Sequence, residues 1–584
     1  MRALSPCCPY APVRAQRRPR KPALTLLRVA ALSTLLIISV ISALSAAPAL
    51  AQQDERPSNA RPNEPGFLEP APEQILEPQP PNADPEDALA PAPPSLRVEA
   101  FEFQGNTAFT DAELNEALRP YRDRALVTED LLEARDQITQ LYLEAGFETS
   151  GVLLPDQVIG RGRVLFQVVE GRLAVVQVKG EKRMDPRFLA REIEAAVGTP
   201  LNVRALETVL QTLQQNPLIE RILARLEPTS VRGESRLVLE LEEARPDDLK
   251  LFTANDRSPS VGVATGGFKA SSGNWLGRRD QFALAGWFTE GLTDIEARYA
   301  LPVGAFGTRL TSRIRFSHSE VVENPFDALN IESESLLVSL GIEQSVYRSR
   351  RTQIDVGLLG DWRRGQSTLD GSLFCFQPGV TDCSPQVTVL RAFGEWRFRG
   401  LESAATVRTQ LSWGTGWLGA TTRPGNVPDG RFLSWLIQAQ AARRVPFGGQ
   451  LITRFDFQRS DDPLLAFERI SVGGARTVRG YRPNQLIRDS GLSGSLEWRT
   501  PLWRRSNGPN ILELAPFFDI GHAWNEVFDA GDNTIASAGL GLLAHPHERV
   551  EASLYWGGRL LGVDRIGDGP IGEGLHFKVV VDAW

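Results

Sequence analysis

The sequence lacks the features that mark several large classes of protein. After position 51 it contains no apolar run of 18 or more residues, which argues against a protein that crosses a membrane with helices. Its 5 histidines are dispersed, and the close pair His545 and His547 has no cysteine or carboxylate cluster to complete a metal site. No glycine-rich phosphate loop, nucleophile elbow or paired carboxylates appear. We therefore expect no metal, no cofactor and no enzymatic activity.

The length and composition leave a few architectures open. With 584 residues, 42% hydrophobic and 23% charged, the chain is too long for one small domain and too ordinary for a wholly disordered protein. At roughly 100–200 residues per domain the length allows about three to five domains, or fewer if one is a large closed β-structure. A membrane β-barrel stays compatible with this composition, because its strands are apolar only at every second residue.

The first 51 residues read as a secretory signal peptide. They hold seven basic residues and no acidic one, followed by an apolar stretch from Val29 to Leu44 and by the small-residue site Ala49-Leu50-Ala51. An uncleaved anchor is the alternative. Cleavage after Ala51 would remove seven positive charges and change the net charge from -7 to -14 (-7 minus 7). A chain with this net negative charge is expected to bind nucleic acid poorly.

An export signal also affects how the cysteines are interpreted. Cleavage leaves Cys375 and Cys383, eight residues apart across a Pro-Gly turn, and an even pair in an exported protein predicts a disulfide that closes a surface loop. Two free thiols are the alternative reading. The segment 52–95 that follows the signal peptide is rich in proline, alanine and glutamate, and we expect an extended linker there.

Residues 96–246 predict two small mixed domains in tandem. In residues 96–171 a strand that ends near Gly105 is followed by two segments of helical periodicity and two strands. The same order recurs in residues 172–246, where Gly180 lies 75 residues after Gly105. Two β-α-α-β-β domains are therefore expected, with a single mixed α/β domain of about 150 residues as the alternative.

Residues 247–584 have almost no helical pattern. They consist of alternating apolar and polar segments of about ten residues, separated by Gly, Pro, Asn and Asp. All 12 tryptophans lie in this part, which is typical of the aromatic girdles of an outer-membrane barrel. We expect a transmembrane antiparallel β-barrel over these residues, and a secreted β-solenoid or sandwich is the alternative.

Three stretches of the chain resemble one known family. The first is YLEAGFETSGVLLPDQVIGRGRVLFQVVEGRL, the second is NDRSPSVGVATGGFKASSGNWLGRRDQFAL, and the third is ISVGGARTVRGYR. Their order is similar to that of the two-partner secretion transporters, the haemolysin activator and haemagglutinin exporters of the Omp85 superfamily. This resemblance implies two periplasmic POTRA domains (96–171 and 172–246) and an outer-membrane barrel of sixteen strands (247–584).

The third stretch corresponds to the family's long loop inside the barrel. Its motif residues here are Gly473, Gly474, Val478, Arg479, Gly480 and Tyr481. An arginine inside a barrel is costly unless a carboxylate meets it, and the segment FFDIGHAW offers one. Its residues Phe517, Asp519 and Gly521 match the family's inward-facing strand motif, so we predict an Arg479–Asp519 pair that pins the loop. A solvated Arg479 is the alternative.

The resemblance also implies the partners. The client would be a large exoprotein with an N-terminal secretion domain, which the first POTRA domain captures as an extended chain at a sheet edge. The candidate contacts are Tyr142, Gly146, Leu154, Pro155 and Gln157, and purely structural packing is the alternative for the apolar residues of this region. The other expected partners are outer-membrane lipid and, because a terminal aromatic such as Trp584 resembles its recognition signal, the barrel-assembly machinery. We expect a monomer.

Two other functions remain open at this point. An outer-membrane protein insertase shares the fold, but it normally carries more POTRA domains, and the segment LLPDQ favours secretion. A passive porin or uptake channel would leave the tandem domains and the VRGY segment without a role.

Overall fold

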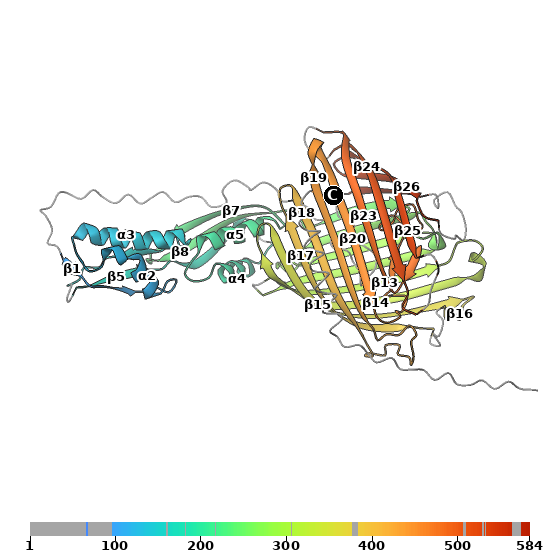
Figure 1. Ribbon diagram of the computed structural model, residues 1–584, viewed down its shortest axis with the longest axis horizontal. Coiled ribbons are helices and arrows are strands. Elements are labelled where there is room, and N and C mark those ends of the chain that lie inside the picture. The colour runs from blue at the N-terminus through green and yellow to red at the C-terminus, as the bar shows by residue number, and fades with distance from the viewer. Residues whose placement is uncertain are drawn as a thin grey trace, which may run out of the picture. The chain divides into compact units, whose positions relative to one another are not determined.

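The computed structural model describes residues 66–67, 96–158, 162–180, 183–216, 218–304, 307–376, 383–505, 510–527, 531, 533–562 and 574–583 (Figure 1). The expected signal peptide, all but two residues of the expected linker, and Trp584 lie outside this range. In the described part of the chain, no helix has both the length and the apolar character needed to span a bilayer.

The first α/β unit has a three-stranded sheet packed against helices. The sheet order is β2-β5-β4, in which β2 and β5 run parallel, and a separate pair is formed by β1 and β3. Helix α2 begins at a capping box, because the Thr110 side chain accepts from the Glu113 amide while Glu113 bonds back to Thr110. The elements are β1 (Leu96–Val98), β2 (Ala100–Gln104), α2 (Asp111–Ala117), β3 (Arg124–Leu126), α3 (Thr128–Glu144), β4 (Gly151–Leu153) and β5 (Arg163–Val169).

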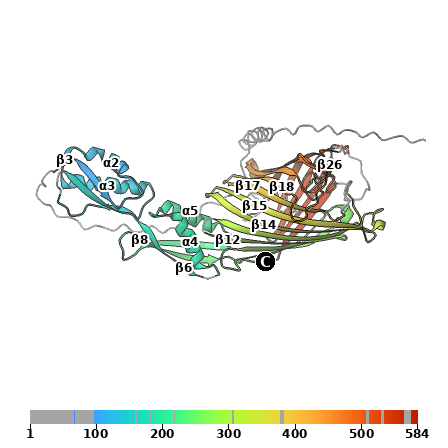
Figure 2. The ribbon, with the colours of Figure 1, turned by 90° about the horizontal axis from the view of Figure 1, so that it is seen from below.

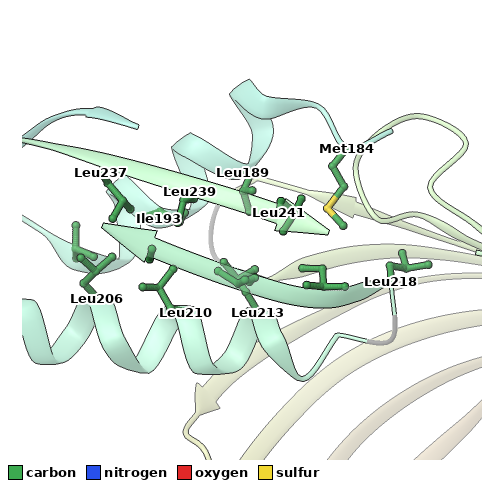
Figure 3. Packing of buried hydrophobic residues seen from close by; sticks show 14 of the residues in the cluster. Met184, Leu189, Ile193, Leu206, Leu210, Leu213, Leu218, Leu237, Leu239 and Leu241 are labelled. Atoms are coloured by element: carbon green, nitrogen blue, oxygen red, sulfur yellow. The ribbon is translucent and has the colours of Figure 1, made fainter. Parts of the chain in front are cut away.

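The second α/β unit repeats this plan with longer strands. Its sheet order is β6-β8-β7, with β6 parallel to β8. Leucines spaced three and four residues apart on α5 (Leu206, Leu210 and Leu213) are buried against the sheet, as Figure 3 shows. Burial of each such side chain contributes about 1.5–3 kcal/mol. The other elements are β6 (Arg172–Gly180), α4 (Pro186–Val197), α5 (Val203–Gln214), β7 (Ile219–Pro228) and β8 (Glu234–Glu243).

The rest of the chain forms a closed antiparallel barrel. Strand β9 pairs with β10 on one side and with β27 on the other, which closes the ring. The ring holds sixteen strands if β16 (Ser372–Leu373), a two-residue extension paired to the end of β15, is not counted. Figure 2 shows β12, β14, β15, β17 and β18 in order across the wall. The first eight are β9 (Asp248–Ala254), β10 (Thr265–Gly273), β11 (Gln281–Phe288), β12 (Leu292–Val303), β13 (Thr308–Glu320), β14 (Ile331–Arg348), β15 (Thr352–Leu369) and β17 (Gln386–Arg399).

The remaining eight strands alternate between two faces as the sequence predicts. On β24, Phe517, Asp519 and Gly521 are buried on the lumen side, while Phe518 and Ile520 are exposed on the outer side. The strands are β18 (Ser403–Thr415), β19 (Leu433–Val445), β20 (Gly449–Ser460), β23 (Ser490–Trp503), β24 (Leu512–Trp524), β25 (Thr534–His547), β26 (Val550–Arg559) and β27 (Leu575–Asp582).

The tryptophans follow this alternation with one clear exception. Trp275, Trp413, Trp498 and Trp556 are exposed, as residues of an aromatic girdle should be. Trp287 is instead buried on the lumen side, where the guanidinium groups of two arginines lie near its ring. A tryptophan in a barrel strand is therefore not by itself a marker of the outer face.

One connection between strands is much longer than the short turns. Residues 461–489, here called the lumen loop, join β20 to β23 and contain a small hairpin made of β21 (Ile470–Val472) and β22 (Leu486–Arg488). The turns at the opposite end of the barrel are short; an example is residues 400–402 between β17 and β18. The long loops therefore gather at one end, which is the end where the lumen loop begins.

Candidate functional site

The tip of the lumen loop is a compact turn. Gly473 and Gly474 both adopt positive φ (118° and 87°), and a Cβ on Gly474 would lie 2.8 Å from the Cα of Pro483. The amide of Gly473 donates to Thr477 Oγ1 at 2.7 Å, and that hydroxyl donates back to the Gly473 carbonyl at 3.0 Å. This local bonding shapes the turn that presents Arg479.

Arg479 is fully enclosed by hydrogen-bond acceptors from the barrel wall. Its Nε lies 2.8 Å from Asp519 Oδ2 and its Nη2 lies 2.9 Å from Asp519 Oδ1, a two-point contact. The Arg479 amide also donates to Asp519 Oδ2 at 3.0 Å. Nη1 donates to Glu497, and Nη2 donates to Ser495 Oγ at 3.1 Å. The side chain is only 4% exposed, so the alternative of a solvated arginine does not describe this structure.

Aromatic rings complete the enclosure of this guanidinium. Its Cζ lies 3.6 Å from the centre of the Phe517 ring and 4.8 Å from that of Tyr555 on β26. The Tyr555 hydroxyl donates to Glu497 Oε1 at 3.1 Å, and Arg499 Nε donates to the same oxygen at 2.7 Å. The excess negative charge of two carboxylates around one arginine is thereby offset, as buried charges require.

The residues on either side of Arg479 fit the wall by shape. Val478 packs where Gly521 leaves space, because a Cβ on Gly521 would lie 3.0 Å from a Val478 methyl carbon. Gly480 (φ +90°) approaches β26 so closely that a Cβ would lie 2.6 Å from the Gly557 carbonyl oxygen. The Tyr481 hydroxyl lies within hydrogen-bond distance of two carbonyl oxygens, 2.9 Å from that of Ala536 and 2.6 Å from that of Leu561, and can donate its one hydrogen to either. Every residue of the VRGY segment therefore contacts the barrel.

Glu497 is the member of this site that the sequence analysis missed. Its segment SLEWRTPL was assigned to a strand, and strict alternation places Ser495, Glu497 and Arg499 on one face. This alternation indicates which face of the strand carries Glu497. What the sequence did not provide is the register that sets Glu497 beside Phe517 and Ser495 beside Asp519.

In the first α/β unit, Tyr142 occupies the core and not a surface. Its side chain is 0% exposed, and its hydroxyl donates to Glu170 Oε1 at 2.9 Å. The same oxygen accepts from the amides of Thr107 at 2.6 Å and Ala108 at 2.8 Å. The prediction that Tyr142 contacts a client is therefore corrected, because its ring faces the interior next to Ile138.

This buried cluster changes two acid–base equilibria. Burial raises the pKa of the Glu170 carboxyl, but the hydrogen bonds from Ala108, Thr107 and Tyr142 outweigh burial and leave its pKa below its ordinary value. Burial, and then the bond to Glu170, raise the pKa of the Tyr142 hydroxyl. Because the folded pKa of Glu170 is lowered, its stabilising effect is present above the unfolded pKa and is lost as pH falls through the folded value.

Glu170→Gln should therefore loosen the segment that precedes α2. In the full-length protein we expect the amides of Thr107 and Ala108 to lose roughly tenfold in hydrogen-exchange protection at neutral pH, since bonds to a charged acceptor contribute about 1.5–3 kcal/mol. Wild type should lose the same protection on acidification below the ordinary range of a glutamate, whereas the variant should not change further. Equal protection in both proteins at neutral pH would contradict this role of Glu170.

The other predicted client contacts differ in exposure. Gly146 (φ +90°) lies just beyond the end of α3, and its carbonyl accepts from the Val203 amide at 2.8 Å. Gln157 extends the sheet with its side chain: its amide nitrogen donates to the Leu165 carbonyl and its amide oxygen accepts from the Leu165 nitrogen, both at 2.8 Å. Leu154 and Pro155 are half-buried, and the neighbouring Val158 is 99% exposed.

Cys375 and Cys383 form a disulfide. The sulfur atoms of Cys375 and Cys383 lie 2.06 Å apart, and the loop they close connects β16 to β17. Over the described ranges, no group of three or more His, Cys, Asp or Glu side chains is arranged to hold a metal ion.

A closed antiparallel barrel with an anchored internal loop, preceded by two small α/β units, is the architecture of a β-barrel membrane protein with an added N-terminal part. A family model described as "Haemolysin secretion/activation protein ShlB/FhaC/HecB" matches residues 233–544, and one described as "POTRA domain, ShlB-type" matches residues 96–171. The first match spans more than half of the 584 residues. The chain therefore belongs to the ShlB/FhaC/HecB family.

Individual relatives agree with this assignment. The outer membrane transporter CdiB of Escherichia coli is 23% identical over 430 residues, which cover 71% of this chain and 71% of the relative. A solved structure of CdiB from Escherichia coli matches 86% of this chain and 93% of its own, with a TM-score of 0.64 and 22% identity. A structure of BamA from Haemophilus ducreyi that lacks POTRA domains 1–3 shares the fold, with a TM-score of 0.51 and 14% identity, and covers 84% of this chain and 100% of its own.

Family membership establishes the general function and location. The protein is a two-partner secretion transporter of the outer membrane, with POTRA structure on the periplasmic side, and it secretes a partner exoprotein through its barrel. The family is one of transporters.

Proposed function

We propose that the periplasmic part (POTRA domains at 96–171 and 172–246) captures the exoprotein by its N-terminal secretion domain, and that the barrel (247–584) exports it in extended form. The observation that carries this proposal is the attachment of the lumen loop by side-chain contacts at its tip, where Arg479 meets Asp519 and Glu497. Side-chain contacts can be broken and remade without unfolding the wall, so the loop is suited to move aside and return.

No nucleotide is needed for this cycle. The client folds outside the cell, and the folded client cannot return through the barrel. Folding of the client therefore sets the direction of transport. The mature chain is proposed to begin after Ala51 and to act as a monomer that the barrel-assembly machinery inserts into outer-membrane lipid. The likeness to BamA concerns the fold alone and does not favour an insertase.

Client capture is proposed at the outer edge of β4 and the segment from Leu154 to Val158. Strand β4 lies at the edge of its sheet, where the Val152 amide donates to Thr139 Oγ1 of α3 at 3.3 Å, and an extended client would pair with the rest of this edge. Leu154, Pro155 and Gln157 stay candidates, and the exposed Val158 adds an apolar contact next to them. Gly146 and Tyr142 support this segment from within the domain.

Secretion of a candidate exoprotein, sought first in the genes adjacent to this one, tests the proposal. Val158→Asp should reduce secretion roughly tenfold, because a charge would replace an apolar contact with the client. The matched control is Val231→Asp, a change at an exposed valine of the second unit (53% exposed), which should leave secretion unchanged. Equal secretion by both variants would contradict capture at this segment. If the wild-type protein does not secrete the exoprotein, that exoprotein is not its client.

A further inference from the structure

The lumen loop makes a further buried ionic contact with the wall, eleven residues before Arg479 in the chain. Glu468, near the start of the loop, accepts a hydrogen bond from Arg391 Nη2 of β17 at 2.9 Å. The same guanidinium donates through Nε to Asp361 Oδ2 of β15 at 2.7 Å and through Nη1 to Ser412 Oγ of β18 at 2.8 Å. Three strands thus converge on one arginine that meets the loop.

This contact is as deeply buried as the one at the tip. The side chains of Arg391, Asp361 and Glu468 are between 2% and 5% exposed. A buried arginine with two carboxylates is stable only while all partners stay in place, and removal of one partner leaves a charge without compensation. The cluster therefore favours one position of the loop over others in which Glu468 has left the wall.

Apolar packing holds the same part of the loop against the same wall. Leu464 and Leu465 are fully buried and form a cluster with Val387 and Val389 of β17 and with Phe432. Phe467 lies over the Arg363 guanidinium of β15, with 4.4 Å between Cζ and the ring centre. A cavity of about 360 Å³ separates this segment from the disulfide-closed loop, since Leu465, Phe467, Cys375 and Cys383 all line it.

The two ionic contacts use different strands. Arg479 meets β23 and β24, whereas Glu468 meets β17 and, through Arg391, β15 and β18. Gln458 of β20 links the two limbs of the loop, because its amide nitrogen donates to the carbonyls of Glu468 at 2.8 Å and Asp489 at 3.0 Å. The loop is therefore attached at its tip to one part of the wall and near its start to another.

We propose that Glu468 and Arg391 form a second, independent anchor of the lumen loop, and that this anchor keeps segment 464–468 docked on the lumen face of β17, at the end of the barrel that carries the long loops. The Arg479 anchor holds the tip. Passage of a client then requires release of the first limb from β17. Arg391 and Glu468 are positioning residues of the resting, closed state. This inference rests on the transport function but is tested without a client.

Hydrogen exchange on the full-length protein in lipid nanodiscs separates the two anchors. Glu468→Gln should raise exchange about tenfold in residues 463–469 and leave residues 473–485 protected. Arg479→Ala should raise exchange in residues 473–485 and leave residues 463–469 protected. The matched control is Glu395→Gln, which alters a lumen carboxylate of β17 that pairs with Arg397 and Arg408 but is not bonded to the loop. Glu395→Gln should change hydrogen exchange in neither segment.

Conductance in planar bilayers then tests the consequence for the pore. Glu468→Gln should increase the fraction of time in the larger-conductance state about tenfold, and Glu395→Gln should match wild type. The proposal is overturned if Glu468→Gln leaves exchange in 463–469 unchanged, if it loosens both segments equally, or if Glu395→Gln opens the pore as much. Heat-modifiable migration identifies variants whose barrel has not folded, and for these Arg391→Lys provides a second, milder test with the same expected exchange pattern. A failure of secretion in wild type would affect the transport function and leave this result unchanged.

Discussion

Arg479→Ala is expected to reduce secretion of the partner exoprotein by about two orders of magnitude while the barrel still folds. The change leaves Asp519 and Glu497 buried without their common partner, and breaking a buried pair costs about 3–5 kcal/mol. At roughly 1.4 kcal/mol per factor of ten, this loss shifts the loop away from its docked position by a factor of 100 or more. The assay is exoprotein in the medium, normalised to the amount of folded barrel.

Two variants show whether the geometry of the contact matters. Arg479→Lys keeps the charge but cannot make the two-point contact with Asp519, so its secretion should lie between those of wild type and Arg479→Ala. Arg431→Ala removes an arginine whose side chain is 58% exposed in a neighbouring loop, and secretion should not change. Normal secretion by Arg479→Ala would show that the anchor has no part in transport.

Gly480→Ala is expected to be nearly as damaging, for a reason of shape. A methyl group would lie 2.6 Å from the Gly557 carbonyl oxygen of β26, a backbone atom that cannot move without displacing the strand. The positive φ of 90° adds a cost of about 1–2 kcal/mol for a residue with a side chain. Together these terms should displace the loop tip and reduce secretion at least about tenfold.

Gly371→Ala is the matched control for the cost of a positive φ in the absence of a close contact. Gly371 also has a positive φ (74°), but a Cβ there would have no atom within 4 Å. The control should therefore secrete like wild type, even though it pays a similar backbone cost. If both glycine variants lose secretion equally, close approach to β26 is not what Gly480 provides.

The pairing of Arg479 with Asp519 could be predicted because each belongs to a short segment that matches a family motif. Glu497 and the cluster of Arg391, Asp361 and Glu468 could not be predicted in this way. Arg391 and Glu468 are 77 residues apart, and their contact depends on the register of β15, β17 and β18 and on the path of the loop through the lumen. Alternation along a strand gives the face of a residue but not its neighbour across the lumen.

The burial of Tyr142 could be predicted from the sequence. Leu131, Ile138 and Tyr142 share the face of α3 that is buried, with the spacing of an apolar helical stripe. A motif match gave weight to Tyr142 as a binding residue, whereas periodicity predicts a core position. Glu170 differs, because its place after a strand does not predict a partner. Only the fold brings the amides of Thr107 and Ala108 to its carboxylate.

Passage of the client through the lumen can be tested by crosslinking from the two faces of one barrel strand. A photo-crosslinking residue at Gln440, on the lumen face of β19, can be compared with one at Ala441, the next residue on the outer face, while a client is stalled by a folded domain at its end. We predict a crosslink to the client from position 440 and none from position 441. A crosslink from position 441, with none from position 440, would contradict transport through the lumen.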